Sequence, residues 1–162
     1  MLEPNLTNYA FIDSQNVNLG IRDIGWRLDW RKFRTLLKER YRVKTAYIFI
    51  GYLPENQDLY QSLQKAGYVL IFKPVLRDKH GKPKGNVDAD LVLQAMIDYP
   101  QYERAVIVTS DGDFYCLVRY LYQKDKLACV LSPGREGCSS LLKTTAKEKI
   151  RFLEDFRSLL EY

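Results

Sequence analysis

Five aspartates stand where a metal ion could be bound, each beside a predicted strand or at the start of a predicted helix. Asp13 closes the apolar stretch YAFID, and Asp111 follows the apolar stretch RAVIVTS. Asp88, Asp90 and Asp113 lie at the starts of two later segments with helical periodicity. A carboxylate that closes a buried strand faces desolvation or repulsion unless a cation is present. Because every candidate ligand is an oxygen, the ions expected are Mg²⁺ or Mn²⁺ rather than zinc.

Each acid also has a simpler structural explanation. Asp113 could cap a helix, Asp88 or Asp90 could complement a helix dipole, and SDGD alone could form a turn. These explanations are weaker for Asp13 and Asp111, which close apolar strands. Crowded carboxylates repel one another, and a divalent ion turns that repulsion into binding. Convergence of the acids at one place would therefore distinguish a metal site from five separate local roles.

The elements that must position these acids alternate between strand and helix. Strands are predicted over residues 9–13, 43–53, 68–76, 104–110 and 126–133. Helices are predicted over residues 28–41, 54–67, 87–99 and 113–125, the first with Asp29 as its N-cap. This alternation indicates βαβ units and a mostly parallel sheet that is covered on both faces. The 162 residues contain no internal repeat or linker, so we expect a single domain over residues 1–162.

The order of the strands decides whether the acids can meet. In open α/β sheets, ligands bind beyond the carboxyl ends of the strands. If the strands at 9–13 and 104–110 are central neighbours, all five carboxylates approach one crevice.

The composition of the chain and the absence of several motifs disfavour a number of protein classes. A net charge of +5 favours a polyanionic partner, and no apolar run is long enough to span a membrane. The N-terminus does not resemble a signal peptide, and three scattered cysteines suit buried thiols in a reducing cytoplasm. The single histidine, His80, excludes a ribonuclease that works through two histidines. No GxSxG, Walker or GxGxxG motif is present, so an α/β-hydrolase or a nucleotide-binding loop is unsupported.

A basic loop immediately precedes Asp88. It carries the four candidate nucleic-acid contacts Arg77, Lys79, Lys82 and Lys84. A cationic arm beside an acid cluster could hold a phosphate backbone, although the same charges would also suit a solvated loop. Trp26, after the first strand, is a candidate for stacking on a base.

Three blocks of sequence carry a resemblance to a known family. They are FIDSQNVN (11–18), KGNVDADLVLQAM (84–96) and VTSDGDFYCLVRYL (108–121). In this order they resemble the signature blocks of NYN-domain proteins of the PIN-like nuclease superfamily, including the bacterial LabA-like group. The similarity spans nearly the whole chain, and three ordered blocks are much more specific than any single acid.

The resemblance implies a PIN-like, three-layer α/β/α fold with a mostly parallel sheet of strand order 3-2-1-4-5. The tail loosely fits the family's serine-led helix, short strand and last helix, which makes KIRFL a sixth, edge strand. One departure is Asn86, an extra residue between KG and VD, which leaves the geometry of Lys84 open. The oligomeric state is also left open, with a homodimer as one candidate.

The resemblance also implies Mg²⁺- or Mn²⁺-dependent cleavage of RNA by an endoribonuclease. The family's acids fall on Asp13, Asp88, Asp90, Asp111 and Asp113, and its asparagine falls on Asn16. We expect Asp13, Asp88 and Asp111 to be the primary carboxylates and Asp90 and Asp113 to complete or flank the site. Asn16 would orient a ligand or the scissile phosphate. Metal-activated water would attack phosphorus and leave 5′-phosphate and 3′-hydroxyl ends.

Two other classes of function compete with this interpretation. The first is an RNA-binding or regulatory protein on the same fold that cleaves weakly or not at all. The second is another Mg²⁺-dependent phosphotransfer enzyme. A HAD-type phosphatase would need an aspartate where Gln15 stands, and a Toprim domain would need a glutamate where Asp13 stands, so both are disfavoured.

Overall fold

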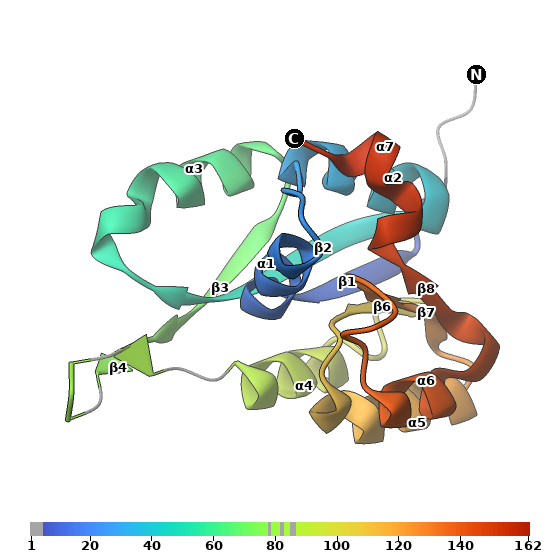
Figure 1. Ribbon diagram of the computed structural model, residues 1–162. Helices are drawn as coiled ribbons and strands as arrows, with labels where there is room; N and C mark the ends of the chain where they lie inside the picture. Colours follow the sequence, from blue (N-terminus) through green and yellow to red (C-terminus); the bar gives the residue numbers. More distant parts are fainter. Residues whose placement is uncertain (1–4, 78, 82, 85–86) are drawn as a thin grey trace.

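The computed structural model describes residues 5–77, 79–81, 83–84 and 87–162, with the backbone alone at 76, 77, 83 and 84. Within this part of the chain, six parallel strands form one sheet in the order β3-β2-β1-β6-β7-β8 (Figure 1). The strands are β1 (Asn8–Asp13), β2 (Val43–Tyr52), β3 (Val69–Pro74), β6 (Ala105–Val108), β7 (Leu127–Ser132) and β8 (Ile150–Phe152). The predicted order 3-2-1-4-5 and the sixth edge strand are confirmed.

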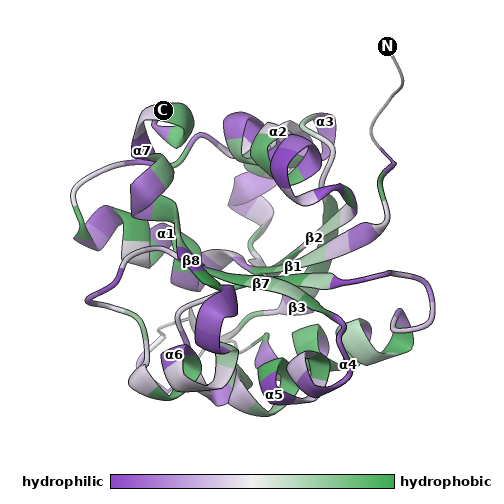
Figure 2. Ribbon diagram, turned by 90° about the vertical axis from the view of Figure 1, so that its right-hand side faces the viewer, coloured by the Kyte–Doolittle hydropathy of each residue, from purple (hydrophilic) through white to green (hydrophobic). Residues whose placement is uncertain are grey.

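Helices cover both faces of the sheet and complete three layers (Figure 2). One face carries α1 (Ser14–Asp23), α2 (Trp30–Tyr41), α3 (Gln57–Lys65) and α7 (Arg157–Leu160). The other face carries α4 (Asp88–Ile97), α5 (Tyr115–Gln123) and α6 (Ser140–Ala146). Short 3-10 segments η1 (Pro54–Asn56), η2 (Gly112–Phe114), η3 (Lys147–Lys149) and η4 (Leu153–Phe156) connect these elements. None of the described helices is both long and apolar enough to cross a membrane.

Burial on both faces explains why the strands are apolar without alternation. In β1, Ala10 and Ile12 belong to the core under α1 and α2, whereas Phe11 belongs to the core under α4 and α5. Successive side chains of a strand point to opposite faces, so a strand covered on both sides needs apolar residues at every position. Asp13 and Asp111 therefore stand out, because Asp13 ends a strand whose preceding residues Ala10, Phe11 and Ile12 are apolar, and Asp111 lies shortly after the apolar strand β6.

Helix ends follow local signals that the sequence already contained. Asp29 caps α2 as predicted, because its Oδ1 accepts hydrogen bonds from the backbone N–H groups of Arg31 (2.9 Å) and Lys32 (3.1 Å). Ser139 likewise caps α6 through its Oγ, which accepts from the N–H of Leu142.

Two segments differ from the sequence prediction. The stretch after Asp13 was not predicted to be helical, but it forms α1, with Val17 and Ile21 buried four residues apart on one side of the helix. The basic loop contains the short antiparallel strands β4 (Leu76–Arg77) and β5 (Pro83–Lys84) and is therefore a hairpin. Among the three free cysteines, Cys129 and Cys138 are buried as expected, but Cys116 is exposed.

A close approach between α1 and the end of β7 holds α1 in place. A Cβ atom on Gly20 would lie 2.7 Å from Cγ of Pro133, so no larger residue fits without a shift. The first turns of α1 carry Asn16, and the position of that residue therefore depends on this contact.

We predict that Gly20→Ala lowers the free energy of unfolding by about 1–3 kcal/mol, because the added methyl group overpacks the contact with Pro133. Helix propensity alone predicts the opposite sign, a gain of about 1 kcal/mol. Chemical denaturation of the two proteins measures the difference. Gly137→Ala is the control, since no described atom lies within 4 Å of its Cβ position. An unchanged or raised stability of Gly20→Ala would contradict the packing argument.

Candidate metal centre

Three of the predicted acids converge at the carboxyl end of the sheet. One carboxylate oxygen from each of Asp13, Asp88 and Asp111 lies within 4.8 Å of the others. Asp13 and Asp111 are brought together because β1 and β6 are paired, with Ile12 opposite Val108. Asp88 joins them as the first residue of α4, which packs on the same face as Phe11. These three residues are called the acid cluster below.

Asp13 is the buried member of the acid cluster, with 6% of its surface exposed. The pKa of its carboxyl is raised from 3.8 to about 6, mainly by burial and then by the nearby carboxylates of Asp88 and, less strongly, Asp111. Hydrogen bonds from the Asn16 backbone and the Thr109 hydroxyl oppose this increase. The carboxylate form is therefore held at a free-energy cost, which a bound cation would offset.

Thr109 connects two members of the acid cluster and was missed by sequence reasoning. Its hydroxyl lies 3.3 Å from Oδ2 of Asp13, to which it donates, and it accepts a hydrogen bond from the N–H of Asp111 at 3.1 Å. Thr109 is fully buried. The signal available in the sequence was a hydroxyl residue that interrupts the apolar run AVIV just before the acid.

The side chain of Asn16 is hydrogen-bonded to Ser110, the residue before Asp111. Its Oδ1 accepts hydrogen bonds from the N–H (2.8 Å) and the hydroxyl (3.0 Å) of Ser110. No described residue forms a hydrogen bond with its Nδ2. Asn16 also lines a hollow of about 260 Å³ together with the acid cluster, so its amide N–H₂ is available to a ligand there.

The remaining two predicted acids take different positions. Asp113 is exposed in η2 and lines the same hollow as the acid cluster. Asp90 is not among the residues that line this hollow, and its Oδ2 lies 3.9 Å from Nζ of Lys73. Residues two positions apart on a helix point in different directions, so Asp88 and Asp90 cannot both face one ion from α4. Four of the five acids therefore line the hollow, whereas Asp90 is placed beside Lys73.

The turn SDGD has a structural role as well. Oδ1 of Asp111 accepts from the N–H of Asp113 at 2.9 Å, so Asp111 and not Asp113 caps the segment. A Cβ atom on Gly112 would collide with Oγ of Ser139, which begins α6. Glycine between the two acids therefore allows the turn to pack directly against α6.

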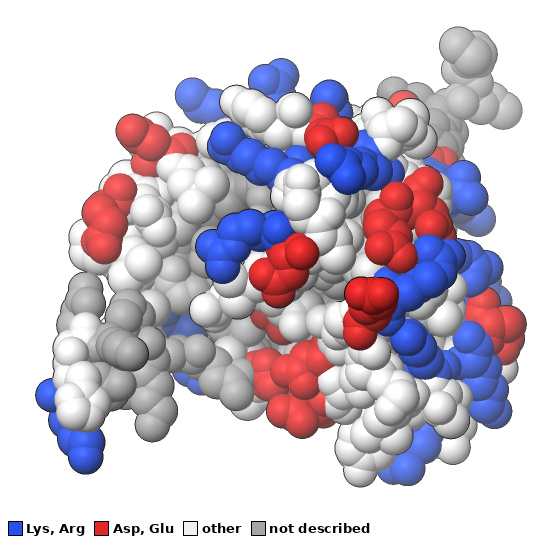
Figure 3. Space-filling model, in the orientation of Figure 1, with Lys and Arg blue, Asp and Glu red and all other residues white. Residues whose placement is uncertain are grey.

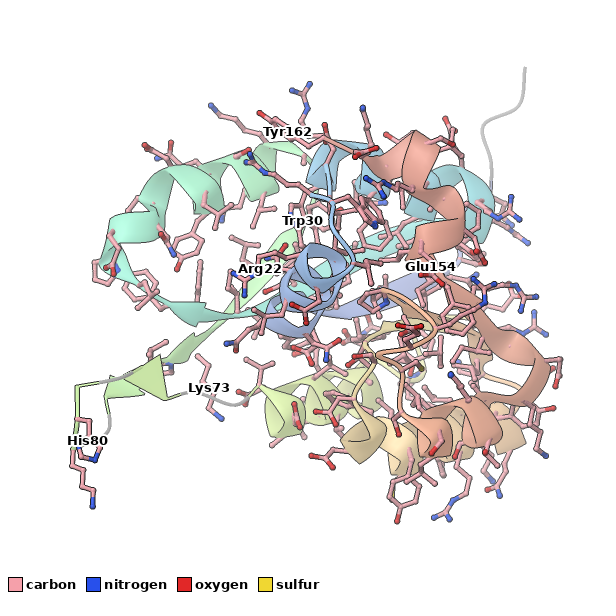
Figure 4. The ribbon with its side chains drawn as sticks, in the orientation of Figure 1. Arg22, Trp30, Lys73, His80, Glu154 and Tyr162 are labelled. Carbon is pink, nitrogen blue, oxygen red and sulfur yellow. The ribbon has the colours of Figure 1, made fainter. Side chains whose placement is uncertain are left out.

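The basic loop is described only in part. Lys79 and His80 are exposed, and His80 lies at the tip of the loop (Figure 4). Arg77 and Lys84 lie in β4 and β5, where the backbone alone is described, and Lys82 and Asn86 lie outside the described residues. The prediction that Trp26 stacks on a base is wrong, because only 6% of its surface is exposed and it belongs to the core under α1 and α2.

The acid cluster fits a divalent cation by the chemistry of its donors. All three are carboxylates, they lie close enough to repel, and the raised pKa of Asp13 reports the cost of that arrangement. Figure 3 shows acidic side chains gathered in the lower centre of this face, while a basic side chain marks the tip of the loop at the left. Such a cluster could bind Mg²⁺ or Mn²⁺ and, through the ion, a phosphate.

Comparisons with known proteins show relatives of this chain in sequence and in fold. The curated protein "Low amplitude and bright protein LabA" of Synechococcus elongatus is 26% identical over 163 aligned positions, which cover 93% of this chain and 86% of that protein. A crystal structure of a protein of unknown function from Vibrio parahaemolyticus superimposes with a TM-score of 0.76 at 23% identity. That alignment covers 96% of this chain and 98% of the other and shows a shared fold.

Family membership follows from a match to a whole-domain sequence model. The model of the NYN domain matches residues 9–154, which include the acid cluster, Asn16 and, apart from Asn8 of β1, the six strands of the sheet. The chain therefore belongs to the NYN domain family, within the PIN-like superfamily.

Proposed function

We propose that this protein is an endoribonuclease that requires Mg²⁺ or Mn²⁺ and cleaves RNA by hydrolysis. The observation that carries the proposal is the acid cluster, three carboxylates within 4.8 Å of one another at the carboxyl end of the sheet. The NYN domain match supports a nuclease-like function. The net charge of +5 favours a polyanionic substrate despite the local acidity of the site.

The residues divide into ligands and positioning groups. Asp13, Asp88 and Asp111 hold the ion, Asp113 completes the site from the same hollow, and Asp90 flanks it in its pair with Lys73. When bound, the ion supplies a lowered pKa for attacking water and positive charge for the phosphate.

Thr109 and Asn16 orient this machinery. Thr109 fixes the carboxylate of Asp13 relative to the backbone of Asp111. Asn16 holds Ser110 with its amide oxygen and offers its N–H₂ to a phosphate oxygen. We infer that Arg77, Lys79, Lys82 and Lys84 of the basic loop contact the RNA backbone, which strengthens binding without taking part in the chemistry.

We predict that Asp111→Asn abolishes cleavage while the protein stays folded. Asparagine keeps an oxygen that can accept from the N–H of Asp113 but removes a negative charge from the metal site. Even partners of metal ligands cost 10- to 100-fold when mutated, so we expect a loss of more than about 100-fold in kcat/KM on labelled RNA. Asp58→Asn, on the exposed surface of α3, is the matched control. Wild-type cleavage by folded Asp111→Asn would rule out the assigned site.

A second prediction concerns metal and pH. Folded Asp13 binds its proton more tightly than the unfolded chain does, so its contribution to stability falls as pH rises from about 4 to about 6 in the metal-free protein. Mn²⁺ should reverse this effect at pH 7.5 and raise the unfolding midpoint by about 5–10 °C at a hundredfold excess over its dissociation constant. At pH 5 protons compete for Asp13, and the increase should be smaller.

Thermal unfolding in Mn²⁺ or EDTA at the two pH values measures this linkage. Asp13→Asn should lose the Mn²⁺-dependent increase and be more stable than the wild type in EDTA at pH 7.5, because an amide carries no charge to bury. An equal Mn²⁺ effect at both pH values, or in Asp13→Asn, would show that the ion binds elsewhere.

The third prediction concerns the product ends. Attack of water on phosphorus leaves a 5′-phosphate and a 3′-hydroxyl, and a 2′-deoxyribose at the scissile position should remain cleavable. Attack by the 2′-hydroxyl would need a general acid and base of near-neutral pKa, usually two histidines, whereas His80 is the chain's only one. Mass spectrometry of the products from one defined oligonucleotide distinguishes the two. A 2′,3′-cyclic phosphate that disappears on 2′-deoxy substitution would overturn the mechanism.

A further inference from the structure

A second hollow adjoins the acid cluster at the carboxyl ends of β1, β2 and β3. Its volume is about 320 Å³, near the lower end of the range for small-molecule sites. The walls come from the start of α1, the end of β2, the first turns of η1 and α3, and the segment after β3. It is called the α1–α3 pocket below. Its size suits one planar heterocycle, and the wall residues named below belong to the described part of the chain.

The walls of the α1–α3 pocket combine apolar surface with amide groups. Leu19 and Leu59 line it and remain 40% and 42% exposed. Such apolar side chains favour a ligand with a flat hydrophobic face.

Three side-chain amides also line the α1–α3 pocket, those of Gln15, Asn18 and Asn56. None of them forms a side-chain hydrogen bond within the described chain. Amides carry a donor and an acceptor side by side, which is the arrangement that recognises the edge of a nucleobase. The amides and the apolar side chains of the pocket therefore favour the same kind of ligand, a flat heterocycle with hydrogen-bonding edges.

The α1–α3 pocket is continuous with the metal site. Gln15, Leu19 and Val87 line both the pocket and the hollow that holds the acid cluster. Lys73 lines the pocket too and extends from β3 toward the start of α4, where it pairs with Asp90 (Figure 4). A polyanion bound at the acid cluster would thus pass the pocket mouth beside an ammonium group.

We propose that the α1–α3 pocket holds the unpaired base of a nucleotide next to the scissile phosphate. The site would then read one base in addition to the backbone, and cleavage would require single-stranded RNA at that nucleotide. This inference rests on the proposed nuclease function and adds a substrate subsite to it.

The test is a scan with abasic nucleotides. One RNA with a single mapped cleavage position is prepared in versions that each lack the base at one position around the cut. For the wild type we expect one neighbouring position at which the abasic change lowers kcat/KM by about 10- to 100-fold, as loss of base stacking does elsewhere. Other positions should change little.

Substitutions in the α1–α3 pocket then test whether the loss of kcat/KM on the abasic RNA arises from this pocket. Leu59→Trp fills the pocket from the exposed surface of α3 and should cleave intact RNA no better than the wild type cleaves the abasic RNA. The abasic penalty should vanish in this variant. The double substitution Asn18→Ala and Asn56→Ala leaves the pocket open and should weaken discrimination among the four bases at the same position. Leu159→Trp, at a leucine 62% exposed on α7, is the matched control and should keep the wild-type profile.

The outcomes distinguish failure of the pocket proposal from failure of the proposed nuclease function. If metal-dependent cleavage continues without any abasic penalty, or if the penalty persists in Leu59→Trp, the pocket proposal is overturned and the nuclease stands. If no RNA is cleaved, the nuclease function fails instead, and the same oligonucleotides are compared by fluorescence anisotropy with wild-type protein in Ca²⁺. A loss of affinity at one abasic position that is absent in Leu59→Trp supports the pocket, whereas equal affinities or no binding overturn it. Should Leu59→Trp fail to fold, the double alanine variant decides by base discrimination: weaker discrimination among the four bases at the sensitive position supports the pocket, and unchanged discrimination overturns it.

Discussion

The parallel pairing of β1 with β6 is the constraint on which the site depends. It sets the ends of two apolar strands side by side, so Asp13 and the segment before Asp111 leave the sheet at the same place. Thr109, the first residue after β6, then bonds to both acids. Asp88 reaches the same point because α4 packs across the face that contains Phe11. A change of strand order would separate these carboxylates, whatever their local surroundings.

The close approach of the three carboxylates lowers the stability of the ion-free folded protein and, for the same reason, favours the binding of a cation. Burial of Asp13 beside Asp88 raises its pKa to about 6, so the ionised site is costly in the folded protein without an ion. Near neutral pH, a bound divalent cation would offset that cost, which is the basis of the proposed metal site. In the proposed function, a basic chain can carry a local acidic site because a bound cation would turn the carboxylates into a place that attracts a phosphate.

Helix α1 connects the metal site to the neighbouring pocket. Asn16 bonds to Ser110 and lines the hollow over the acid cluster, whereas Asn18 lines the α1–α3 pocket. Gln15 lines both. The contact of Gly20 with Pro133 sets the position of this helix on the sheet. One short helix therefore contributes residues both to the hollow over the acid cluster and to the α1–α3 pocket, the two places to which we assign the proposed functions.

The sequence by itself determined the strand order, through the resemblance of its three blocks, and the position of Asp13 and Asp111 at strand ends. Apolar periodicity is local, so it also predicted most helices. The tertiary structure decided which acids meet: Asp88 joins the acid cluster and Asp90 pairs with Lys73. It buried Trp26 and brought Thr109 between two carboxylates. These outcomes depend on the rotation of each helix and the packing of distant segments, and periodicity along the chain does not contain that information.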